Sequence, residues 1–361
     1  MEKNKLFFMS SEYIRQWNEY LVFVSVYSNS FFLFNRKTCN IEKVFQINSE
    51  SVKENLYRDF MIYENELLLI PYAANDFISI NLRSEERKVI STMLEEDQRN
   101  IDAKFLFGIV INGILWCIGK ELHVVCCYDI KQKYKKIKEK IFSKEIIWSD
   151  AYAINENKVY IPSMNKNLIL IINTYTYEIK IEKIIKESVR EGFLDIAYQQ
   201  ETLYLWDELG EEYHLDIKNQ SIKKQCLSAK EIIASRQSFV YKNRIFRIAL
   251  FEDSIIKYDL KNEMRSKIPI AVKNSFNTEM THFHHGILDG NIYWLQTRFG
   301  QLFQINMDDI SLKKIDMAIT NDLESKIVKR KYWNQKMKEE VIWEFKYGGI
   351  FGLQEYICEI V

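Results

Sequence analysis

Residues 157–162 read NKVYIP, residues 168–173 read LILIIN and residues 178–181 read EIKI. The first two runs are apolar, rich in β-branched and aromatic side chains and too short for helices, which predicts two buried strands. The third run alternates apolar with charged residues, as an outer edge strand does. With a further strand over residues 151–154, this stretch predicts one antiparallel sheet of four strands.

The Asn or Asp that closes the second of these runs recurs along the chain. We call these residues the marks: Asn35, Asn81, Asp129, Asn173, Asp216, Asp259 and Asn306. They are spaced by 46, 48, 44, 43, 43 and 47 residues. A unit repeated every 40 to 50 residues or so is typical of propeller blades. The seven marks therefore predict seven blades.

By period and strand order, residues 10–318 resemble the β-propeller superfamily. The resemblance lies in the fold: Trp206–Asp207 follows a second strand, whereas the Trp-Asp of WD40 repeats ends a third strand, and the paired glycines of kelch repeats do not occur in the blades. It implies an all-β fold, a seven-bladed β-propeller of four-stranded antiparallel blades. We expect the strand Leu6 to Met9 to close the ring near the last blade.

The period changes after Thr320. Asn321, followed three residues later by Glu324, is a capping-box pattern, and apolar residues from 323 to 341 fall on one helical stripe. A second short helix is predicted near the end of the sequence. The division is therefore a propeller over 1–318 and a helical appendage over 319–361. We expect the appendage to dock through Leu323, Ile327, Tyr332 and Trp333.

Composition and charge narrow the classes of function. Lys and Arg number 50, and so do Asp and Glu, a balance that argues against a nucleic-acid binder. No apolar run approaches the roughly 18 residues that a membrane span needs. The six cysteines contain no C-x-x-C pair, so neither a zinc ribbon nor a disulfide framework is indicated. We expect a cytoplasmic protein with reduced thiols, no cofactor, no bound metal and no membrane span.

Polar residues recur where the innermost strands are expected to begin. Counting ten residues back from Leu67, Ile114, Val159, Leu203, Ile245 and Ile292 reaches this point in six blades. Radial repetition places equivalent positions around one axis, which predicts a polar funnel at one mouth of the channel. Its predicted members are Arg58, Lys104, Asp150, Asp195, Arg236, His282 and His284. An ordinary solvated rim is the alternative.

The loops between second and third strands open on the same face. Tyr72, Trp206 and Arg298 lie in or beside them, and aromatic and Arg side chains commonly anchor interfaces. Arg298 is included in the predicted binding surface. For Trp206, packing against the neighbouring blade is the favoured interpretation.

Residues 281–285 read THFHH and hold three of the five histidines. On a strand, His282 and His284 would face the same side, the spacing at which two imidazoles can share a metal or divide acid and base roles. No carboxylate stands at strand spacing beside them. The alternative is that they are ordinary polar positions at the start of an inner strand.

These patterns favour a non-enzymatic binding scaffold that presents the propeller mouth and the C-terminal helix to an intracellular protein or peptide partner. Basic residues over 326–338 could let that helix contact the partner. The alternatives are a propeller enzyme, a lyase or hydrolase with His282 and His284 as catalytic residues, and a small-molecule or glycan-binding protein with a His-containing site at the channel mouth. No phosphate loop, dinucleotide fingerprint, nucleophile elbow or HExxH motif occurs.

Overall fold

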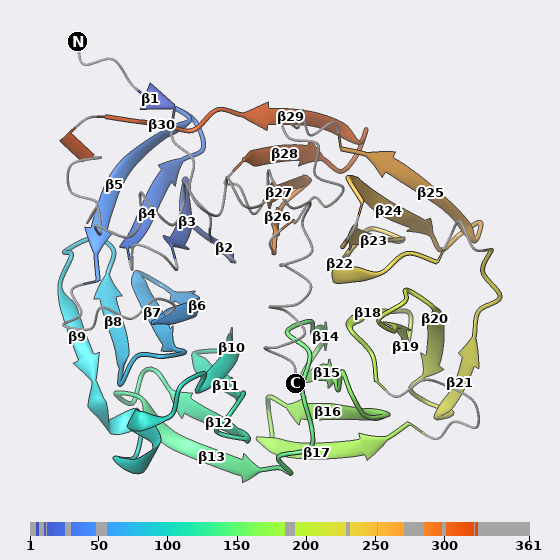
Figure 1. Cartoon of the computed structure of the whole chain (residues 1–361), viewed down its shortest axis with the longest axis horizontal. Coiled ribbons are helices and arrows are strands. Elements are labelled where there is room, and N and C mark those ends of the chain that lie inside the picture. Colours follow the sequence, from blue (N-terminus) through green and yellow to red (C-terminus); the bar gives the residue numbers. More distant parts are fainter. Residues whose placement is uncertain are drawn as a thin grey trace, which may run out of the picture. The chain divides into compact units, whose positions relative to one another are not determined.

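The computed structural model describes residues 5–6, 11, 13–25, 30–47, 56–184, 192–228, 232–250, 252–270, 283, 285–297, 301–320 and 322–323. Within these residues the strands form seven sheets, and in each blade four consecutive strands pair antiparallel in chain order (Figure 1). The chain is a seven-bladed β-propeller, as the marks predict. Across the same residues, no helix has the length and apolar character to span a membrane.

The chain divides into two compact units. One comprises Met1–Ile141 with Phe283–Ile342, and the other comprises Phe142–His282 with Trp343–Val361. The first unit contains blades 1, 2, 3 and 7, and the second contains blades 4, 5 and 6.

In the first unit, blade 1 is β2 (Ile14–Trp17), β3 (Tyr20–Ser25), β4 (Ser30–Asn35) and β5 (Asn40–Gln46). Blade 2 is β6 (Tyr57–Tyr63), β7 (Glu66–Pro71), β8 (Phe77–Asn81) and β9 (Arg87–Ile90). Two short 3-10 helices, η1 (Ser91–Met93) and η2 (Asp97–Asn100), lead to blade 3, which is β10 (Phe105–Ile111), β11 (Ile114–Gly119), β12 (Val124–Asp129) and β13 (Lys135–Ile141). Blade 7 is β26 (Ile287–Asp289), β27 (Ile292–Gln296), β28 (Leu302–Asn306) and β29 (Ser311–Ile315).

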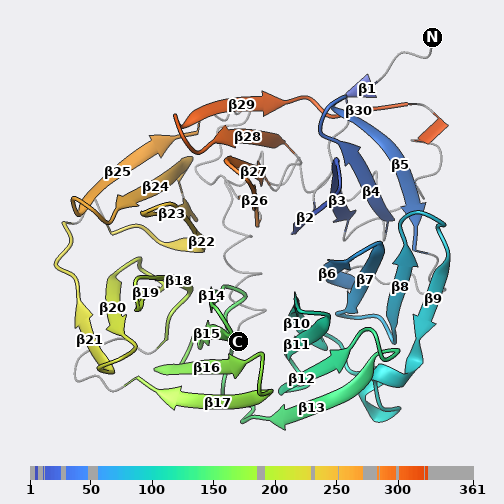
Figure 2. The same cartoon turned by 180° about the vertical axis from the view of Figure 1, so that it is seen from behind.

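In the second unit, blade 4 is β14 (Ala153–Asn155), β15 (Lys158–Pro162), β16 (Leu168–Asn173) and β17 (Glu178–Lys183). Blade 5 is β18 (Asp195–Gln199), β19 (Thr202–Trp206), β20 (Glu212–Asp216) and β21 (Ser221–Lys224). Blade 6 is β22 (Ser235–Tyr241), β23 (Arg244–Ala249), β24 (Ser254–Asp259) and β25 (Met264–Pro269) (Figure 2).

Each mark is the last residue of the third strand of its blade. Its side chain accepts backbone N–H groups of the turn that follows: Asn35 Oδ1 lies 2.8 Å from Lys37 N, and Asn173 Oδ1 lies 2.9 Å from Thr176 N. The other five marks accept turn N–H groups in the same way. A short side chain with a carbonyl or carboxylate oxygen closes such a turn more strongly than a hydroxyl does, which favours Asn or Asp at these positions.

The hydrophobic core lies between neighbouring blades. One cluster combines Leu68 and Phe77 of blade 2 with Leu115 and Tyr128 of blade 3. Another combines Tyr160 of blade 4 with residues of blade 5, among them Leu205 and Tyr213. Within each unit, neighbouring blades cover each other's faces, so most residues of the second and third strands are apolar and buried.

The first unit joins its N-terminal segment to the segment after blade 7. Strand β1 (Lys5–Leu6) pairs antiparallel with β30 (Ala318–Ile319), and β30 pairs in parallel with β5, so both extend the outer edge of blade 1 (Figure 1). Leu6 therefore pairs with chain that follows the last blade, although the sheet it extends is that of the first blade. Residues 7–9 of the predicted strand lie outside the described residues.

The predicted tail is described only at its beginning. Leu323 is half-buried against a cluster that includes Ile14 and Trp294, and its N–H donates to Thr320 Oγ1 over 3.4 Å. Leu323 thus docks on the propeller as predicted. The two predicted helices, the capping pair Asn321 and Glu324, and the docking residues Ile327, Tyr332 and Trp333 lie outside the described residues.

Candidate functional site

The turns between first and second strands fix how the blades align. Tyr63 pairs with Glu66, Ile111 with Ile114, and Asp289 with Ile292. Ile114 and Ile292 are thus equivalent to Glu66, whereas the count from the sequence had aligned them with Leu67. The error arose because blades 3 and 7 carry an apolar residue where other blades carry a polar one. The positions equivalent to Tyr57 are Phe105 and Phe283, one residue after Lys104 and His282.

Two of the predicted binding residues occupy the same special position. In blade 2 the pairing passes from Tyr57 to Asp59, which leaves Arg58 as the extra residue of a β-bulge. In blade 6 it passes from Ser235 to Gln237 and leaves Arg236 as the extra residue. A bulge bends a strand and changes where its side chains point. Arg236 lies in β22, and its side chain is outside the described residues.

Asp59, at the start of β6, joins three innermost strands. Its side chain is 1% exposed. Oδ1 accepts Arg15 Nη2 at 2.9 Å and Phe60 N at 2.7 Å, and Oδ2 accepts Gly108 N at 2.9 Å. Burial raises the pKa of Asp59, while Arg15 and the backbone donors oppose the rise. Since Arg15 lies on β2 and Gly108 on β10, this carboxylate connects blades 1, 2 and 3. We call these four residues the Asp59 lock.

An aromatic stack extends the Asp59 lock to blade 7. The Arg15 Cζ lies 5.1 Å from the centroid of the Tyr13 ring, and that ring stacks on His285 with centroids 4.6 Å apart. In the corrected alignment Tyr13, Asp59 and His285 are equivalent residues of blades 1, 2 and 7. His285 is thus the histidine that the structure places among inner-strand polar groups. His282 and His284 lie outside the described residues, and their predicted roles remain untested.

Asp195 occupies the position of Asp59 in blade 5. It is 0% exposed, and its Oδ2 accepts Ser235 Oγ at 2.5 Å and Ser238 Oγ at 2.6 Å, both from blade 6. Ser235 Oγ also accepts Arg247 Nε at 3.0 Å. Burial raises the pKa of Asp195, opposed by Arg247, and burial lowers the pKa of Arg247 to about 10.

The same polar network continues outward through blades 5 and 6. The Arg247 guanidinium lies over the Trp206 ring, 4.3 Å from its centroid, and Trp206 Nε1 donates to Glu212 Oε2 over 3.1 Å. Glu212 Oε1 lies 2.6 Å from His214 Nε2 and 2.7 Å from Arg265 Nη2. Trp206 is fully buried, so its packing role is confirmed. We call this chain from Asp195 to Arg265 the Asp195 network.

Glu212 is the acidic centre of the outer part of this network. Burial raises its pKa, but the hydrogen bond from His214 and the charge and hydrogen bond of Arg265 outweigh burial and lower the pKa to about 2. His214 Nδ1 lies 2.8 Å from Gln225 Nε2, an arrangement that suits a neutral ring with the proton on Nε2.

Other predicted residues are buried near the starts of inner strands. Lys104 is 0% exposed, and its Nζ donates to Ile101 O. Asp150 is buried just before β14. Arg298 lies outside the described residues. The described part of the chain contains no group of three or more His, Cys, Asp or Glu placed to hold a metal ion.

A partly exposed cationic cluster lies where β7 and β11 end. Arg58 Cζ and Lys120 Nζ lie 5.6 Å and 5.4 Å from the centroid of the Tyr72 ring, and Lys120 Nζ donates to the Tyr72 hydroxyl over 3.0 Å. All three side chains are half-buried. We call Arg58, Tyr72 and Lys120 the Tyr72 cluster. Arg58 was predicted from the sequence, but Lys120 was missed because it follows a second strand, 62 positions beyond Arg58 along the chain.

Backbone hydrogen bonds hold this cluster in place. Lys104 N donates to Tyr72 O and Lys120 N donates to Lys104 O, each over 2.9 Å. Lys104 thus bridges the two loops by its backbone. Backbone hydrogen bonds therefore connect the segments of blades 2 and 3 that carry the Tyr72 cluster.

No protein-family model matches the chain, and no curated protein is significantly similar in sequence. Solved structures with a similar fold do exist. A catalytically inactive histidine-to-alanine variant of virginiamycin B lyase from Staphylococcus aureus, with quinupristin, has a TM-score of 0.63 at 14% identity over 84% of this chain and 97% of the other. The computationally designed protein Ika8 has a TM-score of 0.59 at 7% identity over 87% and 89%.

BamB from Moraxella catarrhalis has a TM-score of 0.53 at 8% identity, over 88% of this chain and 93% of the other. At these identities the likenesses show the propeller fold alone. A lyase and a designed protein share this fold, so the fold by itself does not assign an activity.

Proposed function

We propose that this protein is a non-enzymatic binding propeller that holds a protein or peptide partner through the Tyr72 cluster. The observation that carries the proposal is an aromatic ring in contact with two cationic side chains, all half-buried, on a surface fixed by backbone hydrogen bonds. Aromatic and Arg side chains are enriched among the residues that dominate binding energy at protein interfaces.

The contrast with the inner strands supports this choice. The carboxylates of Asp59 and Asp195 are buried and accept hydrogen bonds from neighbouring blades. Their hydrogen bonds connect neighbouring blades. The Tyr72 cluster instead keeps part of each side chain at the surface, where a partner can reach it.

The proposal is tested by selecting a random dodecapeptide phage library on the purified full chain. Enriched peptides are then measured by fluorescence anisotropy against the wild type, the Tyr72→Ala variant and the Tyr175→Ala variant. Tyr175 is the control because it is a surface tyrosine outside the Tyr72 cluster, 79% exposed, in the turn after a third strand. We expect Tyr72→Ala to weaken binding roughly tenfold or more and Tyr175→Ala to leave it unchanged.

Two results would contradict the proposal. One is the absence of enriched peptides. The other is a Tyr72→Ala variant that binds the peptides as tightly as the wild type and has the same melting temperature. The lyase or hydrolase alternative depends on His282 and His284 and stays a prediction.

A further inference from the structure

We infer that the Tyr72 cluster recognises a carboxylate of an acidic peptide, held between Lys120 and Arg58 at the edge of the Tyr72 ring. This inference rests on the proposed function and adds the chemical class of the partner.

The Lys120 ammonium has donors to spare. An ammonium carries three N–H donors, and in the described residues the side chain of Lys120 makes one hydrogen bond, to the Tyr72 hydroxyl. No carboxylate of the described chain forms an ion pair with it. Because Lys120 is half-buried, part of its hydration shell is already displaced. A carboxylate oxygen would therefore meet a cation that is only partly hydrated.

Neighbouring cationic side chains have acceptors or an acidic partner within the protein. Lys104 is buried and donates to Ile101 O. Arg99 lies 3.6 Å from Asp76 and donates to Ser91 O over 2.7 Å. Lys120, on the same part of blades 2 and 3, has neither an acidic partner nor a carbonyl acceptor within the described residues. The difference marks Lys120 as the group that is open to a ligand.

Arg58 supplies the second cationic group. Its guanidinium lies over the same ring that Lys120 contacts, so both cations lie within 6 Å of one centroid. An anion at the rim of this ring would therefore lie near two positive charges, each of which attracts it. A carboxylate suits this arrangement because it offers two charged acceptor oxygens, and hydrogen bonds to a carboxylate from Lys or Arg are stronger than neutral ones. The Tyr72 hydroxyl, which accepts from Lys120, can donate its own proton to the same anion.

The experiment uses the most enriched dodecapeptide from the random library and an isosteric version of it. In the isostere, every Asp and Glu becomes Asn or Gln, and the C-terminus is amidated. Affinities of both peptides are measured by fluorescence anisotropy for the wild type, the Lys120→Met variant and the Lys166→Met variant. Lys166 is a matched control because it is also half-buried in a loop between a second and a third strand.

We expect the isostere to bind the wild type roughly tenfold to a hundredfold more weakly than the acidic peptide. Lys120→Met should lower the affinity for the acidic peptide by a similar factor and leave the affinity for the isostere nearly unchanged. The affinity of this variant for the acidic peptide should also depend less on salt concentration. Lys166→Met should change neither affinity.

Equal binding of the two peptides to the wild type would overturn the carboxylate inference, while peptide binding at the Tyr72 cluster would stand. The inference is also overturned if Lys120→Met leaves the acidic peptide unaffected, or if only a phosphorylated version of the peptide binds. Absence of any enriched peptide counts against the proposed function itself.

Discussion

Asp59 and Asp195 occupy the same position in blades 2 and 5, yet the two units satisfy them differently. Asp59 accepts a guanidinium from the preceding blade and a backbone N–H from the following blade. Asp195 accepts two serine hydroxyls from the following blade, and the guanidinium of Arg247 reaches it through Ser235. One buried carboxylate at the start of an inner strand can thus connect blades through either backbone or side-chain donors.

The cations differ in their contact with water. The Arg15 side chain is 18% exposed, and it also donates to two backbone carbonyl oxygens. Arg247 is 2% exposed and donates to one backbone carbonyl oxygen, that of Ile233. An unpaired charge costs more free energy the less water reaches it. We therefore expect the Asp195 network to be the more sensitive of the two to loss of its carboxylate.

The largest effect is expected for Asp195→Ala. The change removes the carboxylate that most strongly favours the buried Arg247 cation and the acceptor of two hydroxyls, so the free energy of unfolding should fall by about 4 to 5 kcal/mol. Urea unfolding followed by circular dichroism measures it. A loss of less than about 1 kcal/mol would show that the Asp195 network does not stabilise the second unit.

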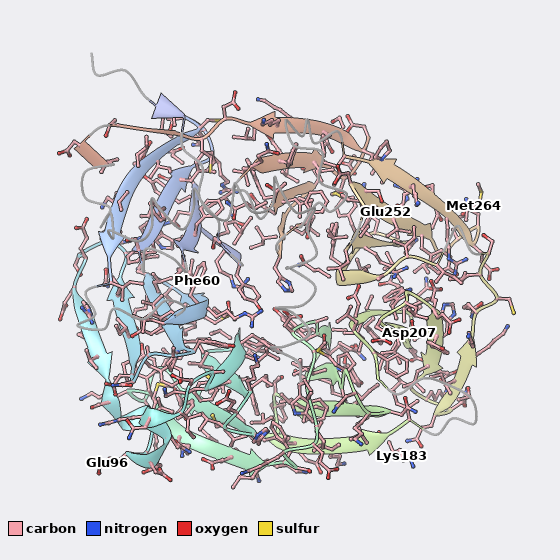
Figure 3. All side chains as sticks on the ribbon, in the orientation of Figure 1. Phe60, Glu96, Lys183, Asp207, Glu252 and Met264 are labelled. Carbon is pink, nitrogen blue, oxygen red and sulfur yellow. The ribbon has the colours of Figure 1, made fainter. Side chains whose placement is uncertain are left out.

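Asp59→Ala should cost less, about 3 kcal/mol, because water and backbone carbonyl oxygens still solvate Arg15. The same urea titration applies. Glu96→Ala, at an exposed acidic residue of the first unit (Figure 3), is the control and should change stability by less than about 0.5 kcal/mol. If Asp59→Ala lowered the free energy of unfolding as much as Asp195→Ala, exposure of the cation would not determine the cost of losing the carboxylate.

Glu212 gives the Asp195 network a dependence on pH. Its folded-state pKa of about 2 lies below the ordinary 4.5, so its contribution is complete above about pH 4.5 and is lost as pH falls through 2. The shift corresponds to roughly 3 kcal/mol at most. We expect the stability difference between the wild type and Glu212→Gln to shrink as pH falls from 5 to 2. A difference independent of pH would contradict the assigned role of Glu212.

The smallest effect is expected for Ser238→Ala. It removes one of two hydroxyl donors to Asp195 and should lower the free energy of unfolding by about 1 to 2 kcal/mol. Ser235→Ala should cost more, since that hydroxyl also accepts from Arg247. Thermal unfolding of the two variants side by side checks the order, and the reverse order would place the important bridge at Ser238.

The blades were predictable because their signals are local. A mark accepts N–H groups two or three residues onward, and a buried strand carries a continuous apolar run, so both can be recognised within ten residues. The alignment of blades 3 and 7 was wrong by one position. The second strands of blades 3 and 7 begin with the apolar residues Ile114 and Ile292, whereas other blades have a polar residue at that position. Only the strand pairing shows which residue comes first.

The candidate site was predictable only in part. Arg58 and Lys104 were found by counting from strands, and the prediction placed both in one polar funnel. In the structure Lys104 is buried and Arg58 lies over Tyr72. Side-chain burial depends on loops that meet only after folding, so neither outcome has a local signal.

Seven four-stranded blades, the marks that close their turns and the apolar faces that must be covered are all encoded locally, since each depends on residues close together in the chain. Tertiary structure alone decided which polar groups meet. Ser11 N finds Gln296 Oε1 across 285 residues, Asp59 finds Arg15 across 44, and Lys120 finds Tyr72 across 48. The physical reason is that a buried polar group needs a partner of suitable geometry but of no fixed sequence distance, so the packing of neighbouring blades chooses that partner.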